Sequence, residues 1–259
     1  MNSIFAYIGG KVNSFLAEVG QMVKLMFAII SYFPRAFRDK HLVLAQMKLI
    51  GADSLPLVVL IGAFTGAIAA LEATDLFIKF NLINLAKPYI GSSIASAVFT
   101  ELTPVLTALV IAGRVGASMA AEIGTMKVTE QIDALEMMAI DKSRYLGMPR
   151  MIAALLMMPM LAVFSDLVAI AGGFILTVVQ FDFSFTMFFE SVQRFFRVSE
   201  LMTGLIKAFV FGGITSIIGC YVGFNTKGGA EGVGQSTVRA YTLSAAMILI
   251  MDAIIGYIL

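Results

Sequence analysis

Four ionisable side chains stand inside long apolar segments of the chain: Glu101, Asp166, Lys207 and Asp252. An ionisable group near the centre of a bilayer costs about 3 kcal/mol or more, so such a group is usually paired with a counter-charge or used in function. For the orientation argued below, Glu101 and Lys207 both lie roughly 10 Å below the outer surface, at 1.5 Å of helix rise per residue. Their matching depth predicts that the two side chains meet.

We expect Glu101 and Lys207 to face a shared cavity, to hold each other's charge and to present a polar site to a lipid headgroup. The structural alternative is a bridge that only locks two helices together. Asp166 and Asp252 reach a similar depth from the other end of their segments, and either could compete for Lys207. The sequence does not choose among the three acids.

Residues for other kinds of site are scarce. With one histidine, His41, and one cysteine, Cys220, the chain lacks the side chains for a metal cluster, an intramolecular disulfide or a Ser/His or Cys/His catalytic set. Asp166 and Asp252 could be the pair of an intramembrane aspartyl protease, but neither follows a Gly-x-Gly pattern. We therefore expect no catalytic residue and no metal site. The net charge of +1 gives no electrostatic case for nucleic acid.

The loop "GGAEGVGQS" is nearly a phosphate-binding sequence. It places Gly229 and Gly234 at the spacing of that pattern, but Gln235 replaces the lysine that would reach the phosphates. We expect a flexible turn here, with Ser236 or Thr237 capping the following helix, and no ATPase site or cofactor in this chain.

Composition places these residues in a membrane. The chain is 59% hydrophobic and 14% charged, whereas soluble domains average about 25% charged residues. A membrane core of ~30 Å needs about 20 apolar residues per helix. We predict an all-α integral membrane protein with five transmembrane helices, at residues 55–71, 94–121, 151–179, 201–224 and 238–259.

Two amphipathic segments flank the spans. Residues 1–41 have a helical apolar stripe interrupted by Lys24, which favours an N-terminal interfacial helix, although a helix packed on the core is the alternative. Residues 181–196 are rich in phenylalanine and predict a short outer-face amphipathic helix. The transmembrane domain then covers residues 42–259.

Lysine and arginine predict the orientation, because basic residues concentrate in cytoplasmic stretches. Their distribution places the N-terminus and residues 122–150 and 225–237 in the cytoplasm. The C-terminus is then on the outer side.

Small residues predict where the helices touch, because close backbone approach is a main source of association energy in lipid. The glycines expected at helix contacts repeat at helical spacing: Gly62, Gly66, Gly113, Gly116 and Gly124.

Residues 128–140 predict a short amphipathic helix on the cytoplasmic side. At 1.5 Å per residue it would be ~20 Å long, too short and too charged to cross a membrane. It would either cap the bundle or dock on a cytoplasmic partner. The residues that we expect at such a partner are Glu130, Ile132, Asp133, Leu135 and Glu136.

The stretch "TELTPVLTALVIAGRVGASMAAEIGTMKVTEQIDALEMMAID" closely resembles the core signature of the MlaE/YrbE-type permeases of lipid-transporting ABC systems. The resemblance continues through "YLGMPRMIAALLMMPML", "LIKAFVFG" and "GGAEGVGQSTVRA", and so covers residues 50–259. Thr100 and Thr103 depart from the pattern, which often has arginine and usually glycine there.

This resemblance implies a homodimeric phospholipid permease of the inner (cytoplasmic) membrane. It implies two partners, a cytoplasmic ATP-binding cassette ATPase that binds the ATP and an outer-side lipid-binding protein with MCE domains. Residues 128–140 look like the coupling helix, and Glu101 and Lys207 match positions of the lipid pathway. Two alternatives remain from other classes: an ion-coupled secondary transporter of an amphipathic substrate, and a structural scaffold.

Overall fold

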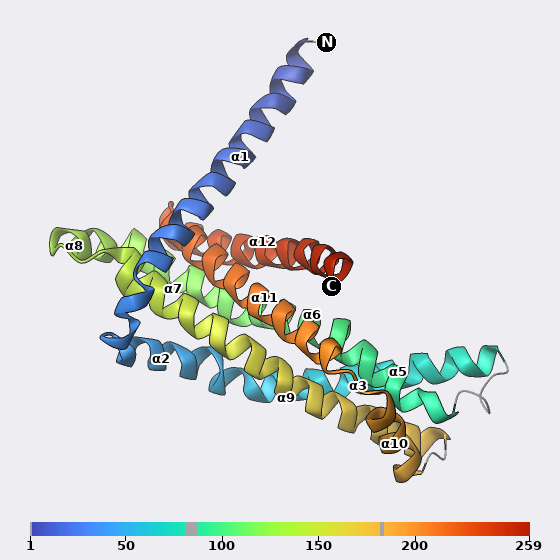
Figure 1. Ribbon diagram of the computed structural model, residues 1–259. Helices are drawn as coiled ribbons and strands as arrows, with labels where there is room; N and C mark the ends of the chain where they lie inside the picture. The colour runs from blue at the N-terminus through green and yellow to red at the C-terminus, as the bar shows by residue number, and fades with distance from the viewer. Residues whose placement is uncertain (1, 81–86, 182–183) are drawn as a thin grey trace.

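The computed structural model describes residues 2–80, 87–181 and 184–259, and over these residues it consists of helices without a strand (Figure 1). Within this part of the chain, five helical stretches are long and apolar enough to cross a membrane. The protein is therefore an all-α integral membrane protein, as the composition predicts.

The five stretches extend beyond the predicted spans at nearly every end. An apolar run marks only the part of a helix that would lie in hydrocarbon, whereas backbone hydrogen bonding continues until a residue breaks it. Short 3₁₀ or π-helical turns interrupt three of the stretches. The first stretch consists of α2 (Lys40–Ile50), η2 (Ala52–Ser54) and α3 (Leu55–Lys79), and the second of α5 (Ile90–Ala97), η4 (Val98–Leu102), α6 (Thr103–Ile111), η5 (Ala112–Gly116) and α7 (Ala117–Val128). The third consists of η6 (Ser143–Gly147) and α9 (Met148–Phe181), the fourth is α11 (Val198–Phe224) and the fifth is α12 (Gly229–Ile258).

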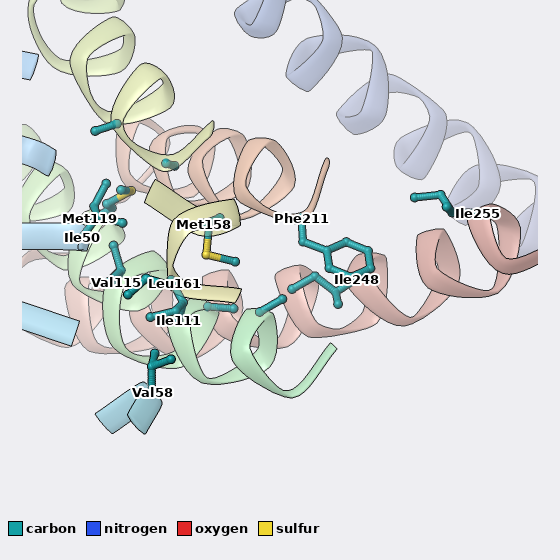
Figure 2. Close-up of a cluster of buried hydrophobic side chains, with 14 residues drawn as sticks. Ile50, Val58, Ile111, Val115, Met119, Met158, Leu161, Phe211, Ile248 and Ile255 are labelled. Atoms are coloured by element: carbon teal, nitrogen blue, oxygen red, sulfur yellow. The ribbon is translucent and has the colours of Figure 1, made fainter. Parts of the chain in front are cut away.

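The bundle packs around α9 and α11. Helices α3 and α9 lie against each other for most of their length, and α11 packs on α9, α7 and α12. At the centre of the bundle, Ile111, Met158, Phe211 and Ile248 come from four different helices and are fully buried (Figure 2). This core fixes the rotation of α6, α9, α11 and α12 about their axes, and so it decides which polar side chains of these helices meet.

Helix α1 (Asn2–Ser31) projects from the bundle in Figure 1, with the N-terminus farthest away. Its second half is attached through Met22, Leu25 and Ile29, which pack on the core, and a 3₁₀ turn, η1 (Phe33–Phe37), leads from it to α2. Glu18 of α1 also forms an ion pair with Arg239 of α12. The predicted helix is thus present, and its location at a membrane surface remains a prediction.

The two short amphipathic helices lie at opposite ends of the bundle (Figure 1). Helix α10 (Phe185–Phe195) falls in the segment predicted at 181–196, of which residues 182–183 lie outside the described part. Helix α8 (Gln131–Met137) is shorter than the predicted 128–140, and this bound was wrong. Val128 is the last residue of α7, and Glu130 adopts a left-handed conformation with φ 60° that separates the two helices.

The fifth stretch also begins earlier than predicted. Helix α12 starts at Gly229, and Gly228 precedes it with φ 90°, a conformation that glycine adopts without steric cost. The expected flexible turn is therefore the first part of a helix. Ser236 does not cap it but accepts a hydrogen bond of 2.8 Å from the Thr226 hydroxyl at the end of α11.

Candidate functional site

Lys207 is held between two carboxylates. Its Nζ lies 2.8 Å from Oε1 of Glu101 on η4 and 2.8 Å from Oδ1 of Asp252 on α12. The predicted pairing of Glu101 with Lys207 is thus present in the structure, and Asp252 joins it. We call Glu101, Lys207 and Asp252 the charged triad. Asp166, the third candidate acid, is buried on α9 and forms no ion pair with a residue that the structure describes.

Exposure differs sharply within the charged triad. The Lys207 side chain is 0% exposed, Asp252 is 20% exposed and Glu101 is 52% exposed. Glu101 is therefore the member that a ligand can touch, while Lys207 acts from behind it. Two carboxylates against one ammonium leave the triad with one excess negative charge when all three groups are ionised. Such a surface can accept hydrogen bonds from cationic or hydroxyl groups.

Glu101 stands on a π-helical turn, η4, that follows from the sequence. The Thr103 amide donates five residues back, to the Val98 carbonyl, and the next residue is Pro104, which has no amide hydrogen to donate. The helix widens there because its normal i to i−4 bonding is lost. Single π turns are frequent at functional sites, since they displace one side chain from the regular helical position.

Gly256 leaves the space beside the charged triad open. A Cβ atom at this position would lie 3.5 Å from Oε1 of Glu101 and 3.6 Å from Nζ of Lys207. Gly256 and Asp252 are one turn apart on α12, so the same face of this helix supplies an acid and the gap next to it. A larger side chain than glycine would narrow the approach to Glu101.

The second candidate site is α8, which has an ion pair near each end. Lys127 lies 2.7 Å from Asp133, and Lys142 lies 2.9 Å from Glu136. Ile132, which the sequence assigned to the partner surface, is only 1% exposed and packs in a core cluster of its own chain. It anchors α8 to the bundle, because the break at Glu130 turns this side of the helix inward.

Two methionines form the exposed apolar tip of α8. Met137, the last residue of the helix, is 90% exposed, and Met138, which follows it, is 63% exposed. Ala139 comes next with φ 58°, a left-handed conformation that ends the segment. Methionine is a flexible apolar side chain that adapts to partner surfaces. Sequence reasoning missed this tip because it placed the two methionines inside a longer helix.

Buried or bidentate ion pairs brace the bundle behind α8. Arg150 of α9 is 8% exposed and lies 2.9 Å from Glu122 of α7. Arg144 of η6 makes hydrogen bonds to both carboxylate oxygens of Asp39, at 3.2 Å and 2.9 Å, just before α2. These pairs join three of the long helical stretches at the end of the bundle next to α8.

A model of the family described as Permease MlaE matches residues 43–258. The chain belongs to the MlaE permease family.

Relatives from distant bacteria match the chain over most of its length. A probable ABC transporter permease protein of Rickettsia felis is 39% identical over 96% of this chain and 94% of its own. One from Synechocystis is 40% identical over 83% of this chain and 81% of its own. The intermembrane phospholipid transport system permease protein MlaE of Haemophilus influenzae is 31% identical over 97% of this chain and 95% of its own.

The five predicted contact glycines of this MlaE-family chain all face a neighbouring segment of the bundle. They differ in how near an added Cβ would lie to the nearest atom of that neighbour. A Cβ at Gly66 would overlap the Ala169 carbonyl oxygen of α9, and one at Gly62 would lie 2.7 Å from that of Ser165. At Gly116 the nearest atom is 2.9 Å away and at Gly124 it is 2.8 Å away. Gly113 makes only an ordinary contact of 3.4 Å.

The predicted set leaves out other glycines at helix contacts, among them Gly172 and Gly204. A Cβ at Gly172 would meet the Ala63 carbonyl oxygen, and one at Gly204 would meet that of Phe99. Gly204 lies one turn before Lys207 on α11, so its close approach to η4 brings the lysine within reach of Glu101. The signal was present in the sequence, because Gly204, Ala208, Gly212 and Ser216 repeat at four-residue spacing along α11.

Proposed function

We propose that the chain is the membrane permease subunit of an ABC transporter that moves phospholipids between the inner membrane and an outer-side carrier or the outer membrane. In this proposal the chain has no ATPase site or cofactor of its own, and a separate cytoplasmic ATPase drives transport. The observation that carries the proposal is the charged triad, where a fully buried lysine supports a half-exposed glutamate inside a membrane-spanning stretch. The name of the Haemophilus influenzae relative supports phospholipid as the cargo.

The charged triad suits a cargo with a polar headgroup and apolar tails. Charge is expensive in the bilayer core, so a site that keeps a carboxylate accessible there must receive a ligand that repays the cost. A headgroup meets Glu101, while the tails stay among apolar side chains. Among these, Leu249 on α12 is 53% exposed and lies one helical turn before Asp252. Lys207 orients Glu101 through their ion pair without touching the lipid.

Helix α8 is the proposed coupling helix. Glu130, Asp133, Leu135 and Glu136 meet the ATPase in this proposal, and the methionine tip described above is added to them. The two ion pairs to Lys127 and Lys142 support this role, because they connect α8 to the chain on either side of it. Ile132 attaches α8 to the core.

The membrane orientation follows the basic residues. The N-terminus and α8 then face the cytoplasm, and the C-terminus faces the periplasm across the inner membrane. This arrangement leaves the outer end of the bundle for a protein with MCE domains. The chain acts as a homodimer in this proposal. Helix α12 supports this, because only 17% of its most apolar segment is buried, compared with 67% for α11, and a second copy could pack on the uncovered side.

Transport in a defined system tests the proposal. The permease and its ATPase are reconstituted in vesicles with a fluorescent phospholipid, and ATP-dependent movement of the lipid is measured for Glu101→Ala, Lys207→Ala and the matched control Glu72→Ala. Glu72 is an exposed acid on α3 outside the charged triad. We expect a loss of at least tenfold for the two triad variants and none for the control. Full transport by both triad variants at normal protein levels would remove the charged triad from the pathway.

A second experiment tests the coupling helix. Co-purification with the ATPase is compared for Leu135→Arg, Asp133→Lys and the control Asp53→Lys, which alters an exposed acid of η2. We expect both α8 variants to lose the ATPase and the control to retain it. Retention by the α8 variants, or transport driven by an ion gradient without ATP, would favour a secondary transporter.

A further inference from the structure

A second polar site lies between the two helical stretches that carry Glu101 and Lys207. It is a pocket of about 690 Å³ where α5 and η4 face the junction of α10 and α11. Pockets of about 300–1,000 Å³ are typical of small-molecule sites. Arg194, Arg197 and Glu200 form one wall. We call this space the arginine pocket.

Hydroxyl groups form the opposite wall. Ser92 and Ser93 both donate to the Tyr89 carbonyl, at 2.8 Å and 3.0 Å, and Thr100 donates to the Ser96 carbonyl at 2.8 Å. A hydroxyl has one hydrogen to donate and two lone pairs that accept. Because each hydrogen is already used within the helix, these oxygens offer acceptors to a ligand. This wall therefore suits an ammonium or hydroxyl donor.

The arginine wall has the opposite chemistry. Arg194 and Arg197 are exposed, and neither forms an ion pair with a residue in the described part of the chain. Guanidinium groups bind phosphate oxygens through paired N–H donors. Glu200, half-buried in the first turn of α11, adds a carboxylate to the same wall. A ligand with only negative charge would meet that carboxylate unfavourably.

We propose that the arginine pocket binds a zwitterionic phospholipid headgroup that joins a phosphate to a primary ammonium. Arg194 and Arg197 donate to the phosphate, while Glu200 and the hydroxyl oxygens of α5 accept from the ammonium. The proposal rests on the lipid transport proposed above and adds a headgroup class to it. A free phosphate ion would use the two arginines and leave the acceptors unused.

The arginine pocket adjoins the charged triad. Ala97, another residue of its wall, lies one helical turn before Glu101, and Thr100 is the neighbour of Glu101 in sequence. From Ser93 to Glu101 the helix rises by ~12 Å, about the length of a headgroup with its glycerol. A lipid therefore passes from one site to the other along a single helix, with the exposed rings of Phe195 and Phe196 beside its apolar part.

The test uses photoactivatable lipids on the purified full-length chain. Phosphatidylethanolamine and phosphatidylglycerol, each with a diazirine near the glycerol, are crosslinked, and adducts are mapped separately on residues 92–100 and 248–258. The variants are Arg194→Gln with Arg197→Gln, Glu200→Gln and the control Glu190→Gln. Glu190 lies one turn before Arg194 on α10 but outside the arginine pocket.

We expect phosphatidylethanolamine to label residues 92–100 of the wild type at least threefold more than phosphatidylglycerol. Phosphatidylethanolamine should label these residues at least tenfold less in the double arginine variant than in the wild type. Glu200→Gln should lose the preference for phosphatidylethanolamine, and Glu190→Gln should keep it. Each variant is first shown to elute as the wild type does in size-exclusion chromatography.

Three outcomes would overturn the proposal. They are equal labelling by the two lipids, wild-type labelling by the double arginine variant, and displacement of the label by millimolar inorganic phosphate, which would indicate a simple anion site. Labelling of residues 248–258 reports on the charged triad independently. If that labelling and transport persist while the arginine pocket fails, the proposed function stands and only this inference is lost.

Discussion

Lys207 is a charged side chain buried completely in a helix bundle, and its two acids explain why it can be there. Removing an ammonium from water costs several kcal/mol, which ion pairs of good geometry can repay. Lys207 has two carboxylate oxygens at 2.8 Å as ion-pair partners, although its Nζ makes no hydrogen bond of regular geometry within the described residues. Asp252 is the less exposed of the two acids, so its charge depends more on Lys207 than the charge of Glu101 does.

The first prediction concerns this lysine. Lys207→Met should lower the free energy of unfolding by about 3 kcal/mol, because it leaves two carboxylates without their counter-charge. Adding Asp252→Asn should recover more of the loss than adding Glu101→Gln, since Asp252 is less exposed. Unfolding in detergent, followed by circular dichroism, measures both effects. If Lys207→Met is as stable as the wild type, the triad does not hold the helices.

At the scale of elements, α3 and α9 approach so closely that glycine is required. We predict that Gly66→Ala lowers the free energy of unfolding by about 1–3 kcal/mol, because the new Cβ would overlap the backbone of Ala169. The matched control is Gly234→Ala on α12, where no atom lies within 4 Å of the added Cβ.

Gly234→Ala should be neutral or gain up to about 1 kcal/mol from the better helix propensity of alanine. Detergent unfolding of the two variants side by side gives the comparison. Equal stability of the two would show that α3 and α9 can separate at no cost.

The segment between α7 and α8 gives a third prediction. Glu130 has φ 60°, and a left-handed conformation costs a residue other than glycine roughly 1–2 kcal/mol. Glu130→Gly should therefore stabilise α8 against local opening by about 1 kcal/mol, whereas Ala134→Gly inside α8 should destabilise it by a similar amount. Hydrogen exchange of the amides of residues 131–138 measures this, and slower exchange in Ala134→Gly than in Glu130→Gly would contradict it.

At the scale of the whole molecule, α12 is the least buried of the five transmembrane stretches. A second copy of the chain could bury its exposed side. Cys220, the single cysteine, is buried, so any disulfide between two chains should come from an introduced cysteine. We predict that Ile250→Cys on α12 forms a disulfide-linked dimer on oxidation in native membranes, measured by non-reducing gel electrophoresis.

The control is Leu60→Cys on α3, which is 55% exposed compared with 52% for Ile250. This variant should remain a monomer because it faces lipid. A dimer of Leu60→Cys together with a monomeric Ile250→Cys would move the interface from α12 to α3.

Much of the architecture could be predicted from single segments. The five spans follow from local apolar length, and Glu101 and Lys207 stand out because a charge in an apolar run needs a reason. The extent of α8 could not be predicted, because the break at Glu130 is a left-handed residue that is not glycine. The burial of Ile132 depends on that break. The wrong assignment of Ile132 to the partner surface therefore followed from the wrong extent of α8.

The sequence by itself determined which segments cross the membrane and which residues carry charge into it, because hydrophobicity is a sum along one helix. Only the tertiary structure decided that Asp252, and not Asp166, joins Glu101 at Lys207. That choice depends on the rotation of η4, α11 and α12 about their axes. Close contacts such as that of Gly204 with Phe99 set this rotation, and they join residues far apart in the chain.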